Sequence, residues 1–217
     1  MSSNYFDGLY SSNKQYFGDH PENILRDYFS MCDKKDRVLD IGIGQGRNAR
    51  FLLQQGYGVD GIDVSKVAID CLNKLKIDEK LDLKLFHMEF EAFTCSQRTY
   101  SAILIINLFP FLSEKQITDL AQKARKWLKR KGIIFVTGYT TNESGLKPNS
   151  PEWIQISKDS YSNGNGDYRT FLDADDAVSK FRRFKTIYKW EGFGERHSHG
   201  DDQIEQHHMF ELILQKI

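Results

Sequence analysis

The chain has 217 residues, of which 40% are hydrophobic, and its 30 basic and 30 acidic side chains balance. This length suits one α/β domain, and the balanced charge argues against a nucleic-acid partner, which usually requires a basic face. The longest apolar run, residues 102–112, is shorter than the roughly 18 to 20 residues that span a bilayer, so we expect no membrane partner.

The N-terminal residues show no basic segment followed by an apolar one, so we expect no secretory signal. Three unevenly spaced cysteines, Cys32, Cys71 and Cys95, fit neither a disulfide framework nor a metal knuckle. We therefore expect a cytoplasmic protein with no bound metal.

Short β-rich runs alternate with helical patterns, which is typical of βαβ units and a parallel sheet. The predicted strands are residues 37–41, 57–62, 81–86, 100–106, 132–139, 184–193 and 208–214. The connection between the last two is short, which indicates an antiparallel hairpin. The predicted fold class is α/β, with a seven-stranded, mostly parallel sheet, helices on both faces and an antiparallel C-terminal hairpin.

Capping signals mark the helices between these strands. Ser65 can cap a helix that follows the second strand, and Ser113 with Gln116 forms a capping box for the clearest helix. Residues 129–132, KRKG, predict a cationic last turn and a glycine exit for that helix. A further helix is predicted over residues 173–184.

The whole chain, residues 1–217, is predicted to be a single domain. Within it, residues 140–172 contain clusters of Asn, Ser, Gly and Pro and indicate a long loop that serves as a lid or insert. Residues 1–30 are expected to cover the binding site.

A glycine-rich turn joins the first strand to the first helix, in the order Asp40, Gly42, Gly44, Gly46. Glycines let the backbone turn sharply and approach a ligand closely. Asp63 ends the next strand, where a carboxylate can accept both ribose hydroxyls of an adenosine. The spacing is G-x-G-x-G rather than the dinucleotide fingerprint G-x-G-x-x-G, and the nearby Asp40 would repel a pyrophosphate. These features favour the cationic cofactor S-adenosylmethionine over a nicotinamide dinucleotide.

Four segments resemble motifs of the class I S-adenosylmethionine-dependent methyltransferases. VLDIGIGQGRNARFL resembles the first motif, VDGIDVS the second, HMEFEAF the third and AILIINLFPFL the fourth. The resemblance covers nearly the whole chain and implies a Rossmann-like sheet. GQGRNA and the N-terminal YFDGLY and YFGDHPENIL are similar to the tellurite-resistance and thiopurine S-methyltransferase-like group, whose members methylate small molecules.

The glycine turn and this resemblance together define the expected cofactor site. Glu89 stands where the family usually has an aspartate facing the adenine amino group. A glutamate carboxylate can accept a hydrogen bond from that amino group as the aspartate does. The N-terminal segment of the group folds over the cofactor. The predicted cofactor-binding residues are Asp40, Gly42, Gly44, Arg47, Asp63, Val64, Glu89, Phe90, Asn107, Leu108, Tyr10 and Phe17.

The turn between the last two strands is rich in histidine and should lie at the mouth of the site if the penultimate strand is parallel to the others. Three interpretations stay open: a solvated loop, substrate contacts from Arg196 or His197, and a metal site. In the related group a His or Arg of this hairpin helps catalysis. The predicted catalytic residues are therefore His197 and Arg196, with Arg47. The place of Arg47 in the first turn of a helix calls for an anionic partner, either the carboxylate of the cofactor or an oxyanion of the substrate, and an ordinary surface arginine is the alternative.

Phe109, Phe111 and Tyr139 are candidates for a wall around the transferring methyl group, with ordinary packing as the alternative. The predicted function is methylation of a small molecule, with a soft or anionic sulfur, selenium or tellurium nucleophile favoured. The alternatives are a nicotinamide-dependent oxidoreductase and a non-catalytic S-adenosylmethionine-binding protein. We expect a monomer or a homodimer.

Overall fold

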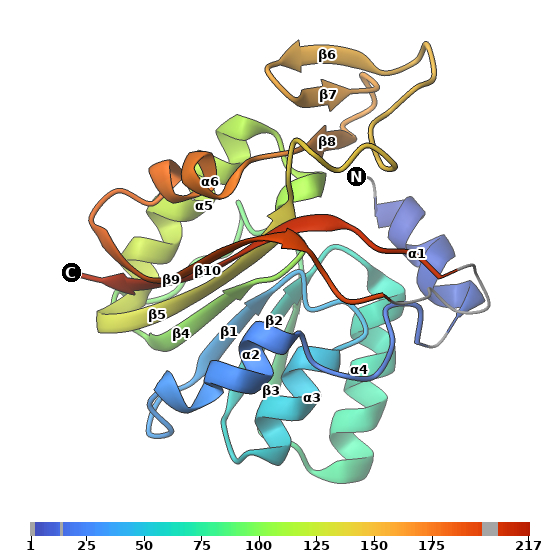
Figure 1. Cartoon of the computed structure of the whole chain (residues 1–217). Coiled ribbons are helices and arrows are strands. Elements are labelled where there is room, and N and C mark those ends of the chain that lie inside the picture. The colour runs from blue at the N-terminus through green and yellow to red at the C-terminus, as the bar shows by residue number, and fades with distance from the viewer. Residues whose placement is uncertain (1–2, 14, 197–203) are drawn as a thin grey trace.

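A computed structural model of the chain describes residues 3–13, 15–196 and 204–217. Its main feature is a seven-stranded sheet with the order β3-β2-β1-β4-β5-β10-β9 (Figure 1). The strands are β1 (Val38–Ile41), β2 (Val59–Asp63), β3 (Leu83–His87), β4 (Tyr100–Ile105), β5 (Leu128–Tyr139), β9 (Phe184–Phe193) and β10 (His208–Lys216).

The strands from β3 to β5 pair in parallel, whereas β10 is antiparallel to both β5 and β9. This confirms the predicted α/β class, the number of strands and the C-terminal hairpin. Because β9 is parallel to β5, the turn between β9 and β10 lies at the edge where the parallel strands end.

Burial separates the central strands from the outer ones. Every residue of β1 and β4 is buried, as expected for strands covered on both faces, whereas β9 alternates between exposed and half-buried positions. This difference matches the continuous apolar runs of the central strands and the mixed composition of the edge strand.

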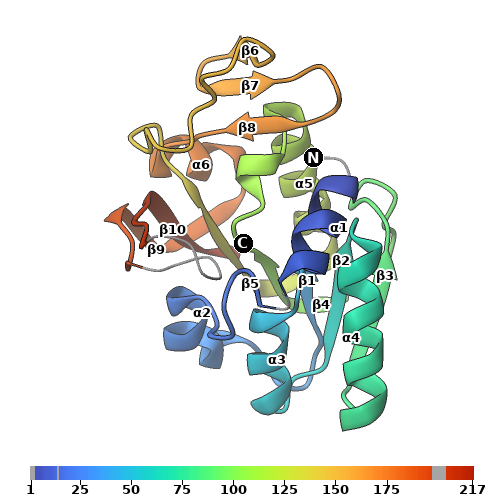
Figure 2. The same cartoon turned by 90° about the vertical axis from the view of Figure 1, so that its right-hand side faces the viewer.

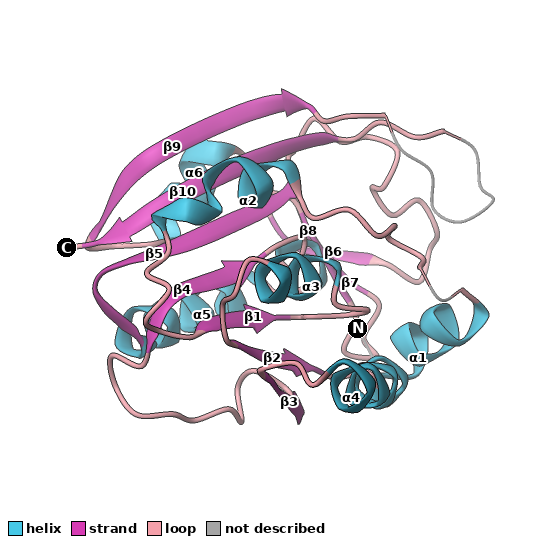
Figure 3. Ribbon diagram, turned by 90° about the horizontal axis from the view of Figure 1, so that it is seen from below, coloured by secondary structure: helices cyan, strands magenta, loops and turns pink. Residues whose placement is uncertain are grey.

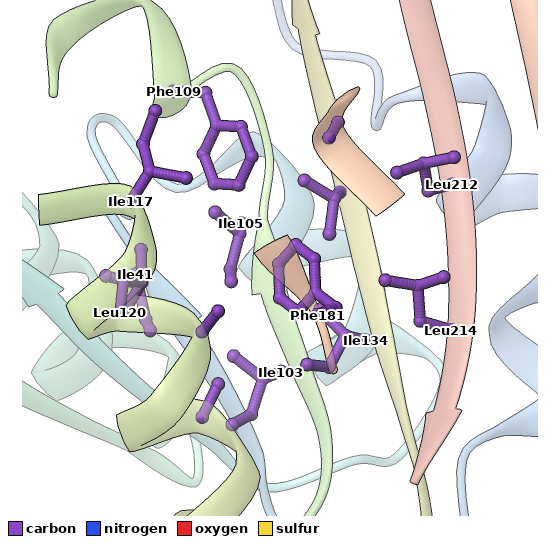
Figure 4. Close-up of a cluster of buried hydrophobic side chains, with 14 of the residues drawn as sticks. Ile41, Ile103, Ile105, Phe109, Ile117, Leu120, Ile134, Phe181, Leu212 and Leu214 are labelled. Carbon is purple, nitrogen blue, oxygen red and sulfur yellow. The ribbon is translucent and has the colours of Figure 1, made fainter. Parts of the chain in front are cut away.

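Helices cover both faces of the sheet. One face carries α2 (Asn23–Tyr28), α3 (Arg47–Gln54) and α4 (Lys66–Glu79), which lie in front of the strands in Figure 3. The other carries α5 (Glu114–Trp127) and α6 (Ala174–Lys180), whose apolar side chains join those of the sheet in one buried cluster. Figure 4 shows Ile117 and Leu120 of α5 and Phe181 after α6 facing residues of the central strands.

Two further segments lie beyond the carboxyl ends of the strands, as Figure 2 shows from that side. The first is α1 (Ser3–Ser12), which packs against α4. The second is a small antiparallel sheet of β6 (Ile154–Ser157), β7 (Ser160–Ser162) and β8 (Tyr168–Thr170). Short 3-10 helices, η1 (Phe29–Met31) and η2 (Phe109–Phe111), complete the chain's regular elements over the described residues.

Residues 140–172, predicted to form a long loop, include these three short strands in their second half. The three short strands form around buried polar side chains: the Ser160 and Thr170 hydroxyls share a hydrogen bond of 2.7 Å, and Thr170 Oγ1 donates to the Leu112 carbonyl, also at 2.7 Å. These bonds attach the small sheet to the loop after β4. Its role as a lid stays a prediction.

The capping box of α5 is confirmed, because the Ser113 side chain accepts from Gln116 N and Gln116 reaches back to Ser113 N. The predicted end of this helix is wrong. The helix ends at Trp127, and Leu128 already pairs with Tyr100 as the first residue of β5. Leu128 is fully buried, so its packing in the sheet prevails over the terminal pattern of the KRKG segment.

A buried carboxylate joins three segments at the opposite end of the sheet, where the parallel strands begin. Asp60 of β2 accepts hydrogen bonds from Arg37 Nε at 2.5 Å and from the Tyr100 hydroxyl of β4 at 2.8 Å. Asp60 and Tyr100 are both almost completely buried. A buried carboxylate destabilises the folded state when one of its hydrogen-bond donors is removed, because its charge is then left without a partner.

Tyr100→Phe should lower the free energy of unfolding by about 1.5–3 kcal/mol, because it removes a hydrogen bond to a buried charge. Urea denaturation measures this change. Tyr168→Phe is the matched control, since its hydroxyl makes no hydrogen bond among the described residues. Equal stability of the two variants would contradict the role given to Asp60.

Candidate functional site

The strand order creates a crevice where β1 and β4 lie side by side. From β1 the chain continues to β2 and β3 on one side, while β4 and β5 lie on the other, so the loops that leave β1 and β4 diverge. Ligands of open parallel sheets bind at such a point. An open cavity of about 1120 Å³, called here the first cavity, lies there, and all of the predicted cofactor-binding residues except Asp40 line it.

The glycine turn forms the floor of the first cavity. Gly42, Gly44 and Gly46 all have positive φ angles, of 75°, 52° and 81°. A Cβ atom on Gly44 would lie 2.9 Å from the Tyr10 hydroxyl, so the glycine also allows α1 to come close. The turn therefore requires glycine both for its backbone conformation and for the approach of the covering helix.

Asp63 fixes the shape of this turn. Its Oδ2 accepts from Gly44 N at 2.7 Å, and its Oδ1 accepts from Ser65 N at 2.8 Å. Burial raises the pKa of Asp63, and the backbone donors of Ser65, Gly44 and Val64 oppose that rise. Each carboxylate oxygen has a further lone pair, so Asp63 can accept from two more donors on a ligand.

Asp40 lies behind the turn rather than on the wall of the first cavity, which corrects its expected placement. Its Oδ2 is buried and makes no hydrogen bond among the described residues. Burial raises the pKa of Asp40 to about 7, the nearby Asp63 adds to the rise, and Arg47 opposes it. A buried carboxylate of this kind is stabilised by a positive charge placed in the cavity in front of it.

The end of the first cavity beyond β2 and β3 is lined by Val64, Met88, Glu89 and Phe90. Phe90 is almost completely buried, whereas Glu89 is exposed on the wall of the cavity. The partial burial of the Glu89 carboxylate raises its pKa. An apolar wall with one carboxylate suits a flat ring that carries a hydrogen-bond donor.

A hydrogen-bonded chain crosses the crevice at the end of β4. The Thr137 hydroxyl donates to Asn107 Oδ1 at 2.9 Å and accepts from Asn107 N at 3.0 Å. Asn107 Nδ2 donates to Glu22 Oε1 at 2.9 Å, and the other oxygen of Glu22 lies 3.1 Å from an Arg47 nitrogen. Asn107 has a positive φ of 53°, and this network fixes that strained backbone in place.

Glu22 is thus the anionic partner of Arg47, and the sequence analysis missed it. Arg47 in a first helical turn called for an anion, but the sequence offers many carboxylates and no spacing that selects one. Glu22 immediately precedes α2, where an acidic residue is also an ordinary helix-start signal. Only the fold brings residues 22 and 47 together.

A second open cavity, of about 1540 Å³, adjoins the first. Phe17, Gly18, Arg47, Asn107 and Tyr139 line both, so the two meet at these residues. This second cavity continues towards the turn between β9 and β10. Its position next to the crevice suits a second ligand.

The histidine-rich turn borders the second cavity. Arg196 is exposed on its wall, whereas His197 and His199 lie outside the described residues. His207 is buried between Glu143 and Glu205, at 3.4 and 3.2 Å, and the His208 ring bonds the Thr140 hydroxyl. The last two histidines therefore support the hairpin, and the role of Arg196 and His197 in catalysis stays a prediction.

The three aromatic candidates separate into two groups. Phe111 and Tyr139 line the first cavity. Phe109 instead packs in the core against Phe181 and Phe210, with ring centroids 6.1 and 6.2 Å away, so for Phe109 ordinary packing is the correct interpretation.

Arg169 of β8 attaches the small sheet to the same wall. Its guanidinium lies 5.2 Å from the centre of the Phe111 ring and 5.3 Å from that of Trp153. Phe6 of α1 contacts Phe111 from another side, with ring centroids 5.2 Å apart. The covering segments from the two halves of the chain thus meet on one aromatic side chain.

The first and second cavities contain no metal-binding cluster: within the described ranges, no three His, Cys, Asp or Glu side chains are grouped to hold an ion. The described helices likewise include none that is long and apolar enough to cross a membrane.

The comparisons with known proteins agree with this geometry. Residues 38–132 match the model of the family described as a methyltransferase domain. Over 108 residues, 49% of this chain, the sequence is 30% identical to the probable S-adenosyl-L-methionine-dependent methyltransferase TehB of Haemophilus influenzae, and the match spans 37% of that relative's length. The chain thus covers well under two thirds of the curated relative.

Two solved structures share the fold along the chain. The crystal structure of Haemophilus influenzae TehB superposes with a TM-score of 0.71 at 19% identity, covering 98% of this chain and 67% of TehB. A protein studied for the conversion of a disulfide bond into a thioacetal group during echinomycin biosynthesis superposes with a TM-score of 0.73 at 14% identity, covering 99% of this chain and 91% of that one.

The strand order and the glycine turn with its acidic partners resemble those of class I methyltransferases, the class whose cofactor is S-adenosylmethionine, and residues 38–132 match a methyltransferase domain. Within this class the chain is similar to the TehB group. The predicted fold is confirmed, and these similarities agree with the predicted class and cofactor.

The raised pKa of Asp40 predicts a pH-dependent stability. The folded chain holds this proton more tightly than the unfolded chain, so the free energy of unfolding falls as pH rises from about 4 to about 7. Asp40→Asn removes the charge at nearly constant shape. It should raise the free energy of unfolding by about 1–3 kcal/mol at pH 8 and change it little at pH 4.

Urea denaturation of the ligand-free protein at the two pH values tests this. Asp70→Asn, at an exposed ion pair with Lys66 on α4, is the matched control and should show no such dependence. An Asp40→Asn effect that is the same at both pH values would show that Asp40 is not the titrating group.

Proposed function

We propose that the chain transfers the methyl group of S-adenosylmethionine to a small molecule that binds in the second cavity. The observation that carries this proposal is the junction of the two cavities at Arg47, Asn107 and Tyr139. One cavity has the features of a nucleoside site, and the other opens beside it, so a donor and an acceptor can meet there.

The residues of the first cavity fit this cofactor. Asp63 has lone pairs for the two ribose hydroxyls, and Glu89 with Phe90 offers a carboxylate and an apolar surface for the adenine. The unpaired Asp40 carboxylate behind the turn favours a positively charged methionine end and disfavours a pyrophosphate. Asn107 and Leu108 lie at the junction, where that end would be held.

The bound cofactor supplies an already activated methyl group on its sulfonium, so the chain's own residues mainly align the reactants and exclude water. Asn107 is fixed between Thr137 and Glu22, and Arg47 is held by Glu22, which keeps the junction rigid. Burial, with the charges of Glu22 and Glu143, raises the pKa of Tyr139. Its hydroxyl therefore remains protonated and can donate a hydrogen bond.

The acceptor favoured by the sequence resemblance is a soft or anionic sulfur, selenium or tellurium nucleophile. The junction supports this choice, because it holds no free general base among the described residues and a thiolate or chalcogen anion needs none. Arg47, Arg196 and His197 remain the candidates for contacts to the acceptor. We also infer no nucleic-acid or membrane partner, a cytoplasmic location, and a monomer or homodimer.

Asp63→Asn should weaken the binding of S-adenosylhomocysteine by about tenfold to a hundredfold, because the amide nitrogen cannot accept a hydrogen bond from a ribose hydroxyl. Isothermal titration calorimetry measures the affinity of both proteins. Asp70→Asn is again the control with the same change of charge, and NADH is the control ligand.

Tight binding of NADH and none of S-adenosylhomocysteine would refute the proposal and favour the oxidoreductase alternative. Binding of S-adenosylhomocysteine without methyl transfer to any thiol, selenite or tellurite would favour the non-catalytic alternative. Transfer of a labelled methyl group from S-adenosylmethionine to one of these acceptors would distinguish a methyltransferase from a non-catalytic binding protein.

A further inference from the structure

One wall of the second cavity is formed by the C-terminal hairpin. Glu211 of β10 lies directly opposite Trp190 of β9 in the strand register, and both line the cavity. Directly opposite residues of an antiparallel pair have neighbouring side chains. Tyr188, two residues before Trp190 and on the same face of the strand, lines the cavity as well.

The Glu211 carboxylate has no ion-pair or hydrogen-bond partner among the described residues. It is only partly exposed, and burial together with the carboxylates of Glu22, Asp27 and Glu195 raises the pKa of Glu211 to about 7. A positive charge in the cavity would stabilise the ionised Glu211 carboxylate, because it would compensate for the lost hydration and for the repulsion from the neighbouring carboxylates.

Among the described residues, the basic groups that line the second cavity do not pair with Glu211, and His20 is exposed beside Asp19. Arg47 is held by Glu22, 3.1 Å away, and Arg196 is exposed on the wall. His207 is buried between Glu143 and Glu205. Over the part of the chain that the structure describes, the cavity therefore presents a carboxylate without a paired cation next to aromatic rings, which is the usual composition of a site for an organic cation.

We propose that the methyl acceptor carries a positively charged group, a protonated amine or a quaternary ammonium, which binds beside Glu211, Trp190 and Tyr188 while its nucleophilic atom lies at the junction of the two cavities. This rests on the proposed function and narrows it. A soft nucleophile that is part of a cationic molecule fits the cavity, whereas a free oxyanion placed beside Trp190 and Tyr188 would meet the Glu211 carboxylate.

Three probes of nearly the same shape but different charge test the proposal: choline, its neutral isostere 3,3-dimethylbutan-1-ol, and 3,3-dimethylbutanoate. Their affinities for the full chain are measured by nuclear magnetic resonance titration, with and without saturating S-adenosylhomocysteine. Choline should bind about tenfold more tightly than the alcohol, because it alone pairs with the carboxylate and the rings, and the anion should bind most weakly.

Glu211→Gln should abolish this tenfold preference and leave the affinity for S-adenosylhomocysteine unchanged, which also shows that the variant is folded. Glu79→Gln, an exposed position at the end of α4, makes the same change in net charge and should keep the preference. Tighter binding of the anion, no binding of choline in the millimolar range, or an unchanged preference in Glu211→Gln would overturn the proposal. Failure to bind S-adenosylhomocysteine would instead refute the proposed function, and the titrations without it would still decide the cation question.

Discussion

The site depends on the pair of hydrogen bonds that Asp63 accepts from Gly44 N and Ser65 N. They tie the loop after β1 to the start of the helix that follows β2. Together with the backbone bonds from Gly42 N to Ile62 O and from Gly46 N to Ile43 O, both 2.9 Å, they fix one conformation of the glycine turn and its positive φ angles. The energetic cost is a carboxylate held away from water, and the two backbone donors offset part of it.

A second network extends this order across the crevice. Thr137, Asn107, Glu22 and Arg47 connect β5, the end of β4, the start of α2 and the start of α3. Arg47 and Asn107 border both cavities, and Thr137 and Glu22 hold them in place through hydrogen bonds and an ion pair. For the proposed function, the same contacts shape the place of the donor and the entrance of the acceptor, as an in-line transfer requires of a protein that contributes mainly alignment.

The sequence predicts the parts of this structure that follow from local pattern. Hydrophobic runs located the seven strands, and the turn glycines with Asp63 located the first cavity, because these signals lie within a few residues of one another. Glu22 and Glu211 could not be found in this way, since their meaning comes from partners far along the chain. The strands β6 to β8 were missed because they are short, polar and held by side-chain hydrogen bonds such as that of Thr170 rather than by an apolar period. The end of α5 was misplaced because the burial of Leu128 outweighs a terminal signal.

The contact of Arg169 with Phe111 has a thermodynamic consequence for ligand binding. Phe111 lines the first cavity, while Arg169 belongs to the small sheet of β6 to β8. A ligand that favours one position of Phe111 also favours the position of the small sheet that fits it. By linkage, fixing the sheet in that position strengthens ligand binding by the same free energy. Cooperativity between the cofactor and whatever touches the small sheet is thus reciprocal and equal in size in both directions. It requires no contact between the two ligands themselves.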